Sequence, residues 1–393
     1  MNPIAISDYT LCSALGAGRD ATLDALRAGR SGLAPARFLD VELPTWIGEV
    51  AGLDAAPLPP DLSEFDCRNN RLAWIGLQQD GFAASVLAAR ERWGAHRVAV
   101  LLGTSTAGLL ETELAYRRRG PHGELPDDVR YEERQNTYSV GAFVTRAFDL
   151  RGPSWVVSTA CSSSAKVYAT AARLIDAGLV DAALVGGVDS LCLTTLYGFN
   201  SLELLSPEPC RPWDAHRRGL SIGEAAAFAL LERDAKAPQG WLLGAGESND
   251  GYHMSTPHPD GVGAIAAMRA ALASAALAPD AIGYVNLHGT ATPSNDASED
   301  RAVGSVFGDA TPCSSTKGAT GHTLGAAGGV EAAICLLALR DGLMPGGLNV
   351  RERDPALKLN YLLENRAAPL NAVLSNSFGF GGTNASLVFG TAR

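Results

Sequence analysis

A cysteine in a turn of small residues is the first candidate for chemistry in this chain. Residues 156–164 read Val-Val-Ser-Thr-Ala-Cys-Ser-Ser-Ser, so Cys161 follows β-branched residues that are typical of a strand. Apolar residues then recur at helical spacing from Ala165 to Ile175, which predicts a helix that ends near Gly178. A thiol just before a helix faces the positive end of the helix dipole, so we expect its thiolate to be favoured.

Two histidines lie in separate downstream segments that contain glycine. His288 is in the segment 286–290 (Asn-Leu-His-Gly-Thr), and His322 ends the segment 317–322 (Lys-Gly-Ala-Thr-Gly-His). An isolated cysteine or histidine is more often a core or loop residue than a catalytic one. One cysteine combined with distant histidines, however, is the usual arrangement for catalysis by a thiol nucleophile.

Composition narrows the class of protein. The chain has 393 residues, of which 46% are hydrophobic and only 19% charged. A typical soluble domain has about 25% charged residues, so we expect much buried surface in a large core or a subunit interface. The net charge of −10 argues against a nucleic-acid-binding protein, which needs a basic surface, and against adhesion to anionic membranes.

Targeting and redox signals point to the cytoplasm. Residues 1–16 carry no basic stretch of the kind that begins a signal peptide, and the apolar run 332–339 is too short to span a bilayer. The 7 cysteines are scattered without a Cys-x-x-Cys pair. We therefore expect reduced thiols, no disulfide framework and no zinc site.

The chain divides into two similar halves, 1–235 and 236–393. The polar segment 232–240, which ends in Pro-Gln-Gly, marks the break between them. Each half combines a strand, a turn of small residues and a long Ala-rich helix, with Cys161 in the first turn and the segment 317–322 after the second strand. This pattern predicts an internal duplication.

Apolar strands precede the candidate residues. Residues 97–102, 182–185 and 282–287 read as continuous apolar strands, which are typical of sheets covered by helices on both faces. Ligands in such α/β folds gather beyond the carboxyl ends of the strands. Because Cys161, His288 and His322 all follow strand ends, we expect the three side chains to meet.

Four segments resemble the β-ketoacyl-acyl-carrier-protein synthase family of the thiolase superfamily, in its elongating Cys-His-His branch. They are residues 158–164, 288–293, 317–328 and 376–384, and they occur in the family's order over nearly the whole chain. The resemblance implies a thiolase-like α/β fold, with two halves related by a pseudo-two-fold axis in α-β-α-β-α layers. It also implies a dimer and no cofactor or metal.

The same resemblance implies a role for each motif residue. Cys161 would hold an acyl group as a thioester, and His288 and His322 would stabilise the enolate formed when a malonyl thioester loses carbon dioxide. Lys317 would orient and polarise the site. Glu331, on the following helix, would be its partner, because a buried ammonium group is costly without one.

A Gly-rich turn before the last strand resembles the family's gating loop. In that resemblance, the N–H groups of Phe380 and Cys161 form an oxyanion hole, and the Phe380 ring closes the acyl pocket. Phe378 and Gly381 belong to the same turn, in which glycines permit large dihedral changes. The segment 249–254, with Asp250, resembles a second loop that moves with it, so His253 and His258 are expected to be loop residues.

The resemblance also implies an acidic acyl carrier protein as partner. This chain is acidic too, so docking requires a local basic patch. The candidates are Arg68, Arg71, Arg117, Arg118 and Arg119, the last three in the polar surface segment 111–135.

Departures from the family pattern suggest a specialised pathway. Residues 5–12 lack the usual Thr-Gly-x-Gly opening, and residues 211–222 differ from the common pattern. Polyketide or aryl polyene assembly would fit, with either an identical or a ketosynthase-like partner chain.

The motif residues also bear on three other classes of protein. A non-catalytic partner that shapes chain length usually lacks one of the residues that are present here. A degradative thiolase needs a second cysteine near the C-terminus, but the last one, Cys335, lies in an apolar helix. A starter-unit synthase pairs cysteine with histidine and asparagine, which the Lys317–His322 motif does not match.

Overall fold

Five strands in the first half form the part of the sheet that leads to Cys161. The computed structural model describes residues 1–392. The second strand in the order given below is parallel to its neighbours on both sides, and the last two strands each pair antiparallel with the strand before them. Three of the strands are buried along their whole length, which explains their continuous apolar sequence. The order is β6 (Ser154–Val157), β5 (Val98–Gly103), β7 (Ala182–Asp189), β9 (Ala225–Glu232) and β1 (Ile4–Ser13).

The second half repeats this order and these strand directions. The duplication predicted from the sequence pattern is therefore present in the fold. The strands β1 and β10 pair over three residues, which joins both halves into one 12-stranded sheet. The second set is β12 (Pro312–Ser314), β11 (Tyr284–Asn286), β16 (Ala372–Gly379), β17 (Thr383–Gly390) and β10 (Gly240–Asn249), with β14 (Asn360–Tyr361) beyond β12.

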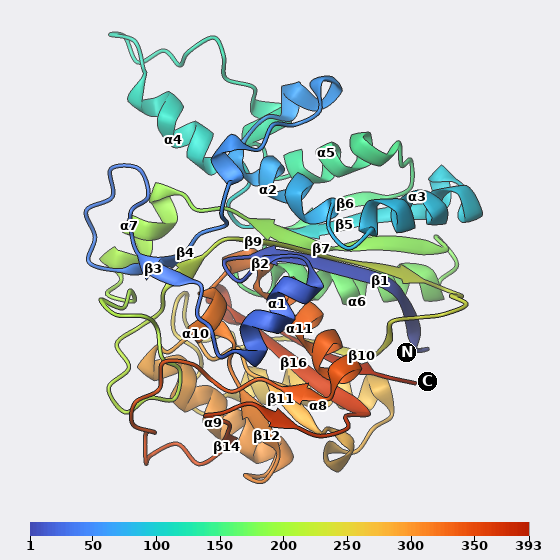
Figure 1. Cartoon of the computed structure of the whole chain (residues 1–393), viewed down its shortest axis with the longest axis vertical. Coiled ribbons are helices and arrows are strands. Elements are labelled where there is room, and N and C mark those ends of the chain that lie inside the picture. The colour runs from blue at the N-terminus through green and yellow to red at the C-terminus, as the bar shows by residue number, and fades with distance from the viewer. Residues whose placement is uncertain (393) are drawn as a thin grey trace.

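Two helices form the middle layer of the molecule (Figure 1). They contact each other and strands of both halves. The other long helices pack on the outer faces, so the predicted layered α/β fold is confirmed. The middle helices are α6 (Ser163–Asp176) and α11 (Ala327–Asp341), and the outer ones are α2 (Arg68–Leu77), α3 (Phe82–Trp93), α5 (Ser139–Phe148), α8 (Val262–Ala275) and α9 (Pro293–Phe307).

The helix α11 is buried on all sides from Ala327 to Leu339. A helix that is apolar all round is typical of the core of a large protein. Gly328 permits its close approach to α6, since an added Cβ there would lie 2.7 Å from the backbone nitrogen of Ala165.

No helix within residues 1–392 has the length and apolar character needed to cross a membrane.

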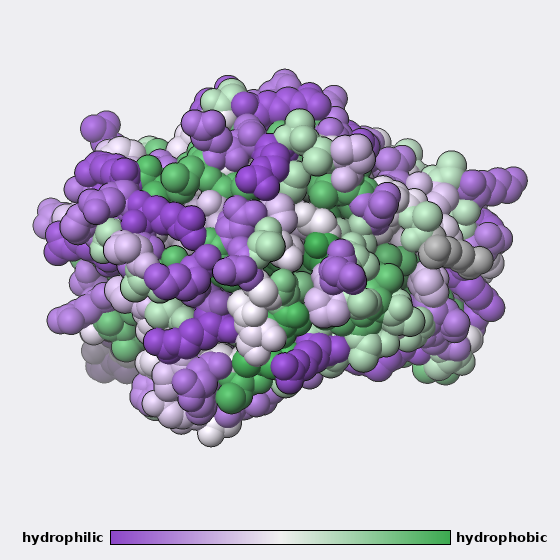
Figure 2. Space-filling view, turned by 90° about the horizontal axis from the view of Figure 1, so that it is seen from below, coloured by the Kyte–Doolittle hydropathy of each residue, from purple (hydrophilic) through white to green (hydrophobic). Residues whose placement is uncertain are grey.

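The polar segment 111–135 lies at the surface, as expected. It projects from the top of the molecule in Figure 1 after α4 (Leu109–Arg117), and Tyr131–Gln135 form a π-helix. The opposite face shows hydrophobic residues interspersed with hydrophilic ones (Figure 2). The shorter elements include α1 (Arg19–Arg27), α7 (Leu193–Ser201), α10 (Lys317–Thr320), β2 (Gly16–Ala17), β3 (Leu33–Pro35), β4 (Trp46–Gly48), β8 (Ile222–Gly223), β13 (Leu343–Met344) and β15 (Arg366–Ala367).

Candidate active site

Cys161 lies in a tight turn between β6 and α6, as the sequence predicts. The preceding residue, Ala160, has φ 52°, a left-handed conformation that costs an L-residue about 1 kcal/mol. Hydrogen bonds hold the turn: Ser163 Oγ donates to the Ala160 oxygen at 2.6 Å and accepts from the Thr159 N–H at 2.8 Å. The fold therefore supports local strain that fixes the sulfur in place.

His322 lies directly beside the sulfur. Its Nε2 is 2.9 Å from Cys161 Sγ. Its backbone is held on both sides, because its N–H donates to the Ser221 oxygen and its oxygen accepts from the Gly223 N–H. No partner within residues 1–392 reaches its Nδ1, so the ring is oriented by its backbone and by packing.

His288 completes the group. Its ring lies 5.3 Å from the His322 ring at an interplanar angle of 85°. The sulfur and one nitrogen of each imidazole all lie within 4.8 Å of one another, so the three predicted residues do meet. Lys317 Nζ is 3.5 Å from His288 Nδ1; as an ammonium it can only donate, which leaves Nε2 to carry the ring proton.

Two carboxylates that the sequence analysis missed hold the His288 loop. Glu299 accepts hydrogen bonds of 2.8 Å from the N–H groups of His288 and Gly289. Asp296 accepts from the Ala291 N–H at 3.1 Å, and Ala291 has φ 67°. The spacing of Asp296 and Glu299 puts both on one face of α9, directly after the His288 motif. That spacing was a signal available in the sequence.

Lys317 and Glu331 form a buried ion pair, with 1% and 2% of their surfaces exposed. Lys317 Nζ also donates to the backbone oxygen of His288. The expected partnership is present, and it fixes the ammonium behind His288. Burial raises the pKa of the Glu331 carboxyl to about 7, against the lowering effect of Lys317.

The protonation states favour neutral groups at rest. Burial raises the pKa of the Cys161 thiol to about 12, although Lys317 and the Phe380 N–H act in the opposite direction. Desolvation, the largest effect on this pKa, therefore opposes the thiolate that the helix dipole is expected to favour. Burial, together with Lys317, holds the pKa of both His288 and His322 well below the ordinary value.

The Gly-rich turn closes over the sulfur. The Phe380 N–H donates to Cys161 Sγ, and the Phe380 ring lies 5.4 Å from the Phe199 ring on α7. The Phe378 ring lies 6.0 Å from the His288 ring. Gly381 and Gly382 have φ 76° and 71°, values that glycine adopts without strain.

Hydrogen bonds join this turn to the loop after β10. The Gly381 N–H donates to the Met254 oxygen at 2.7 Å, and the Asp250 N–H donates to the Gly382 oxygen at 2.9 Å. Asp250 Oδ1 accepts from Asn384 at 2.7 Å. His253 and His258 are loop residues, as expected, and His258 donates its N–H to Asp250.

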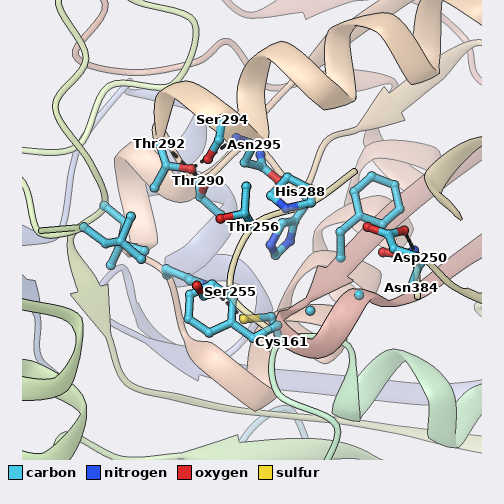
Figure 3. Close-up of a pocket in the computed structure, with 18 of the residues that line it drawn as sticks. Cys161, Asp250, Ser255, Thr256, His288, Thr290, Thr292, Ser294, Asn295 and Asn384 are labelled. Atoms are coloured by element: carbon cyan, nitrogen blue, oxygen red, sulfur yellow. Dashed lines mark hydrogen bonds between the residues drawn. The ribbon is translucent and has the colours of Figure 1, made fainter. Parts of the chain in front are cut away.

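The cavity above the sulfur is small, about 50 Å³. Figure 3 shows Cys161 and His288 facing the cavity, with Ser255 and Thr256 of the loop after β10 lining it beside them. A ligand of drug size needs about 300 Å³ or more, so this closed state cannot hold a long acyl chain. Further lining residues that were not anticipated are Thr290, Thr292, Asn295, Phe199, Leu204 and Leu220.

Cys161, His288 and His322 also have ligand types suitable for a metal ion. A histidine that binds a metal usually donates its other N–H to an acceptor. Here His288 Nδ1 faces the Lys317 ammonium, and His322 Nδ1 has no acceptor within residues 1–392. Among the described residues, neither imidazole therefore has the acceptor that usually orients a metal-binding histidine.

The five candidate docking arginines differ in their surroundings. Arg68 is 5% exposed and is paired with Glu224, Glu49 and Asp54, so we do not retain it as a docking residue. Arg71 pairs with Asp66. The three others lie on the surface: Arg117 pairs with Asp40, Arg118 pairs with Asp128, and Arg119 lies 5.2 Å from the Tyr116 ring.

Comparisons with known proteins agree with this site. Residues 1–237 match the family described as "Beta-ketoacyl synthase, N-terminal domain", and residues 240–351 match the corresponding C-terminal domain. The chain is 33% identical to the 3-oxoacyl-[acyl-carrier-protein] synthase 2 of Coxiella burnetii, covering 98% of this chain and 97% of that protein. It is also 33% identical to nodulation protein E of Rhizobium meliloti, covering 93% of each.

Solved structures show the same fold. A chain of the ketosynthase–chain length factor complex from Xenorhabdus doucetiae has a TM-score of 0.92 and 41% identity, covering 100% of this chain and 98% of that one. A β-ketoacyl synthase from Burkholderia phymatum has a TM-score of 0.89 and 31% identity, covering 100% of both chains. The chain belongs to the β-ketoacyl synthase family. It is a condensing enzyme of the acyltransferase type.

Proposed function

We propose that this enzyme extends an acyl chain by two carbons, using Cys161 as nucleophile and malonyl-acyl-carrier-protein as the carbon donor. The contact of 2.9 Å between Cys161 Sγ and His322 Nε2, with His288 beside them in a buried cavity, carries this proposal. The acyl chain would be a fatty acyl, polyketide or aryl polyene chain. The carrier protein appears in the names of the curated relatives.

In the first step, Cys161 Sγ attacks the carbonyl carbon of the acyl thioester on the carrier. The thiol proton passes to the departing sulfur of the carrier, so a new thioester replaces the old one, while His322 keeps its proton on Nε2 and donates to Cys161 Sγ. Because the resting group is a thiol, proton transfer accompanies attack rather than preceding it. The N–H groups of Phe380 and Cys161 donate hydrogen bonds to the developing oxyanion.

In the second step, the malonyl carboxylate leaves as carbon dioxide, and its electron pair forms an enolate. His288 and His322 donate from Nε2 to the enolate oxygen, and their lowered pKa keeps them neutral for this task. The enolate carbon then attacks the acyl group on Cys161. The C–S bond breaks, the thiolate takes up a proton from solvent, and a β-ketoacyl carrier protein is released. Lys317 orients His288 and does not exchange protons.

The closed turn is the gate of this cycle. Withdrawal of the Phe380 ring from Phe199 would open space beside Cys161 for the acyl chain. The hydrogen bonds between Gly381 and Met254, and between Asp250 and Asn384, would move with it. The carrier would dock near Arg71 and Arg117–Arg119.

A second chain would pair with the edge strand β6. This strand has only β5 as a neighbour in the sheet, and Trp155 on it is 45% exposed. An exposed edge with a large aromatic side chain is suited to pairing with another strand. The relative solved with its chain length factor shows that two-chain assembly occurs in a similar protein. An identical chain or a ketosynthase-like chain could take that place.

The seven cysteines are free and buried, so we infer a reducing compartment, the cytoplasm.

The alternative of a non-catalytic partner chain is disfavoured, because the nucleophile and both histidines are assembled at one site, with the Lys317–Glu331 pair behind His288.

The mass of the intact protein tests the proposal. After incubation with a carrier protein that holds a short acyl group, the wild type should gain the mass of one acyl group. Cys161→Ala should gain none, and Cys210→Ala, which removes another buried thiol, should behave as the wild type. A wild type without an adduct would refute the nucleophilic role.

A further inference from the structure

Asp189 is a buried carboxylate that the steps above do not use. It ends β7, which lies between β5 and β9 in the sheet, and its exposed fraction is 0%. No lysine, arginine or histidine of residues 1–392 forms an ion pair with it. A buried charge without a counter-ion requires a full set of hydrogen bonds, so its donors indicate what it holds together.

One group of donors comes from the turn after β5. Asp189 Oδ1 accepts from Thr104 Oγ1 at 2.6 Å, from the Ser105 N–H at 2.8 Å and from the Thr106 N–H at 2.9 Å. This turn is attached to the Cys161 side of the site. The Thr104 N–H donates to the Val157 oxygen at the end of β6. An added Cβ on Gly103 would lie only 2.3 Å from the Ser164 backbone nitrogen.

The other donor comes from the His322 side. The Gly325 N–H, three residues after His322, donates to Asp189 Oδ2 at 2.5 Å. The intervening Leu324 has φ 53°, so this short connection is strained. His322 Nδ1 has no partner within residues 1–392, so the position of the ring depends on how its backbone is held.

We propose that Asp189 is a positioning residue for the Cys161–His322 pair. Its carboxylate holds the loop after His322 to the turn that packs against the Cys161 elbow, and this keeps Nε2 in contact with the sulfur. The inference rests on the proposed function, because it assigns Asp189 to the acyl-transfer step.

Asp189 supports the reaction by positioning the pair, but its negative charge acts against formation of the Cys161 thiolate. It raises the pKa of the Cys161 thiol, as does Glu331, whereas Lys317 lowers it. Replacing the carboxylate with an amide should therefore make the thiolate more accessible while loosening the geometry. Loss of a residue that only stabilised the fold would not make the thiolate easier to form while it slowed acylation.

The test compares Asp189→Asn with the wild type in two assays. One is the rate of Cys161 acylation by acyl carrier protein, followed by intact mass, and the other is the pH profile of Cys161 alkylation by iodoacetamide. Acylation should slow about tenfold or more, because a small misplacement of reacting groups is costly. The alkylation profile should shift toward lower pH.

Two further variants complete the design. Asp8→Asn is the control: Asp8 is a buried carboxylate that accepts from a backbone N–H, from the hydroxyl of Ser85 and from Arg19. It lies on β1, which contributes no residue to the lining of the cavity, so acylation should be unchanged. Gly325→Ala leaves the carboxylate intact, but its Cβ would lie 2.8 Å from Asp189 Oδ2. It should slow acylation without the shift in the alkylation profile, and it carries the test if Asp189→Asn does not fold.

Acylation of Asp189→Asn or Gly325→Ala within about twofold of the wild type would overturn the proposal. An equal loss of acylation and alkylation would also overturn it, because that result indicates general unfolding. If the wild type itself forms no acyl adduct, the proposed function fails, whereas the alkylation profiles still report on Asp189.

Discussion

At the scale of single residues, the account depends on two uncharged imidazoles beside a thiol. His322→Ala should reduce carbon dioxide release from malonyl carrier protein by about 100-fold or more, as removal of a preorganised oxyanion donor does. Release by the wild type should stay constant as the pH falls through about 6.5, the ordinary histidine value, because burial holds both pKa values well below it. An acid limb near that value, or retained release by the variant, would contradict the assignment.

The Lys317–Glu331 pair gives a second prediction at this scale. Lys317→Met leaves the Glu331 carboxylate buried and unpaired, so the free energy of unfolding should fall by about 3 kcal/mol. Without Lys317, which lowers the pKa of Glu331, that carboxyl takes a proton more readily. The loss should therefore be smaller at about pH 6 than at about pH 8.

Denaturant unfolding checks this, with the double variant Lys317→Met and Glu331→Leu as control. The double variant should recover most of the lost stability but not the decarboxylation. A single variant as stable as the wild type at both pH values would show that the pair is not energetically coupled.

At the scale of elements, the gate consists of two loops that must fit together. An added Cβ on Gly382 would lie 2.7 Å from Asp250 Cβ, at a φ of 71°. Gly382→Ala should therefore keep the turn from closing on Cys161. We expect alkylation of Cys161 to become several times faster and condensation to fall about tenfold. Alkylation of the variant that is no faster than that of the wild type would show that the substitution does not open the turn, and would contradict this prediction.

The sequence predicted the elements well where the pattern is strong. The strand before Cys161, the helix after it and the strand before His288 are all present, with boundaries shifted by at most two residues. The motif resemblance located the three residues that meet. The left-handed conformations of Ala160, Ala291 and Leu324 were not predictable, because tertiary contacts rather than residue type impose them.

Long-range electrostatics also escaped sequence reasoning. The helix dipole at Cys161 can be predicted from local sequence, whereas the burial that raises the pKa of the thiol depends on the whole fold. Arg68 looked like a surface charge because its partner Glu224 lies far away in the sequence. Asp189 carries no motif, and only its hydrogen bonds indicate its importance.

At the scale of the whole molecule, we predict that the proposed dimer forms through the edge strand β6. Trp155→Asp places a charge on the exposed edge strand β6, so the variant should shift from dimer to monomer. Sedimentation velocity measures this, and Trp241→Phe, a change on the strand β10 in the second half, serves as control. A variant that remains a dimer would place the interface elsewhere.

The most direct test of the central claim follows a single turnover. The enzyme is first acylated on Cys161 and then mixed with malonyl carrier protein, and intact mass records both proteins over time. The account predicts that the acyl adduct disappears at the rate at which a β-ketoacyl carrier protein, two carbons longer, forms. An adduct that persists while product accumulates, or product formation by Cys161→Ala, would contradict it.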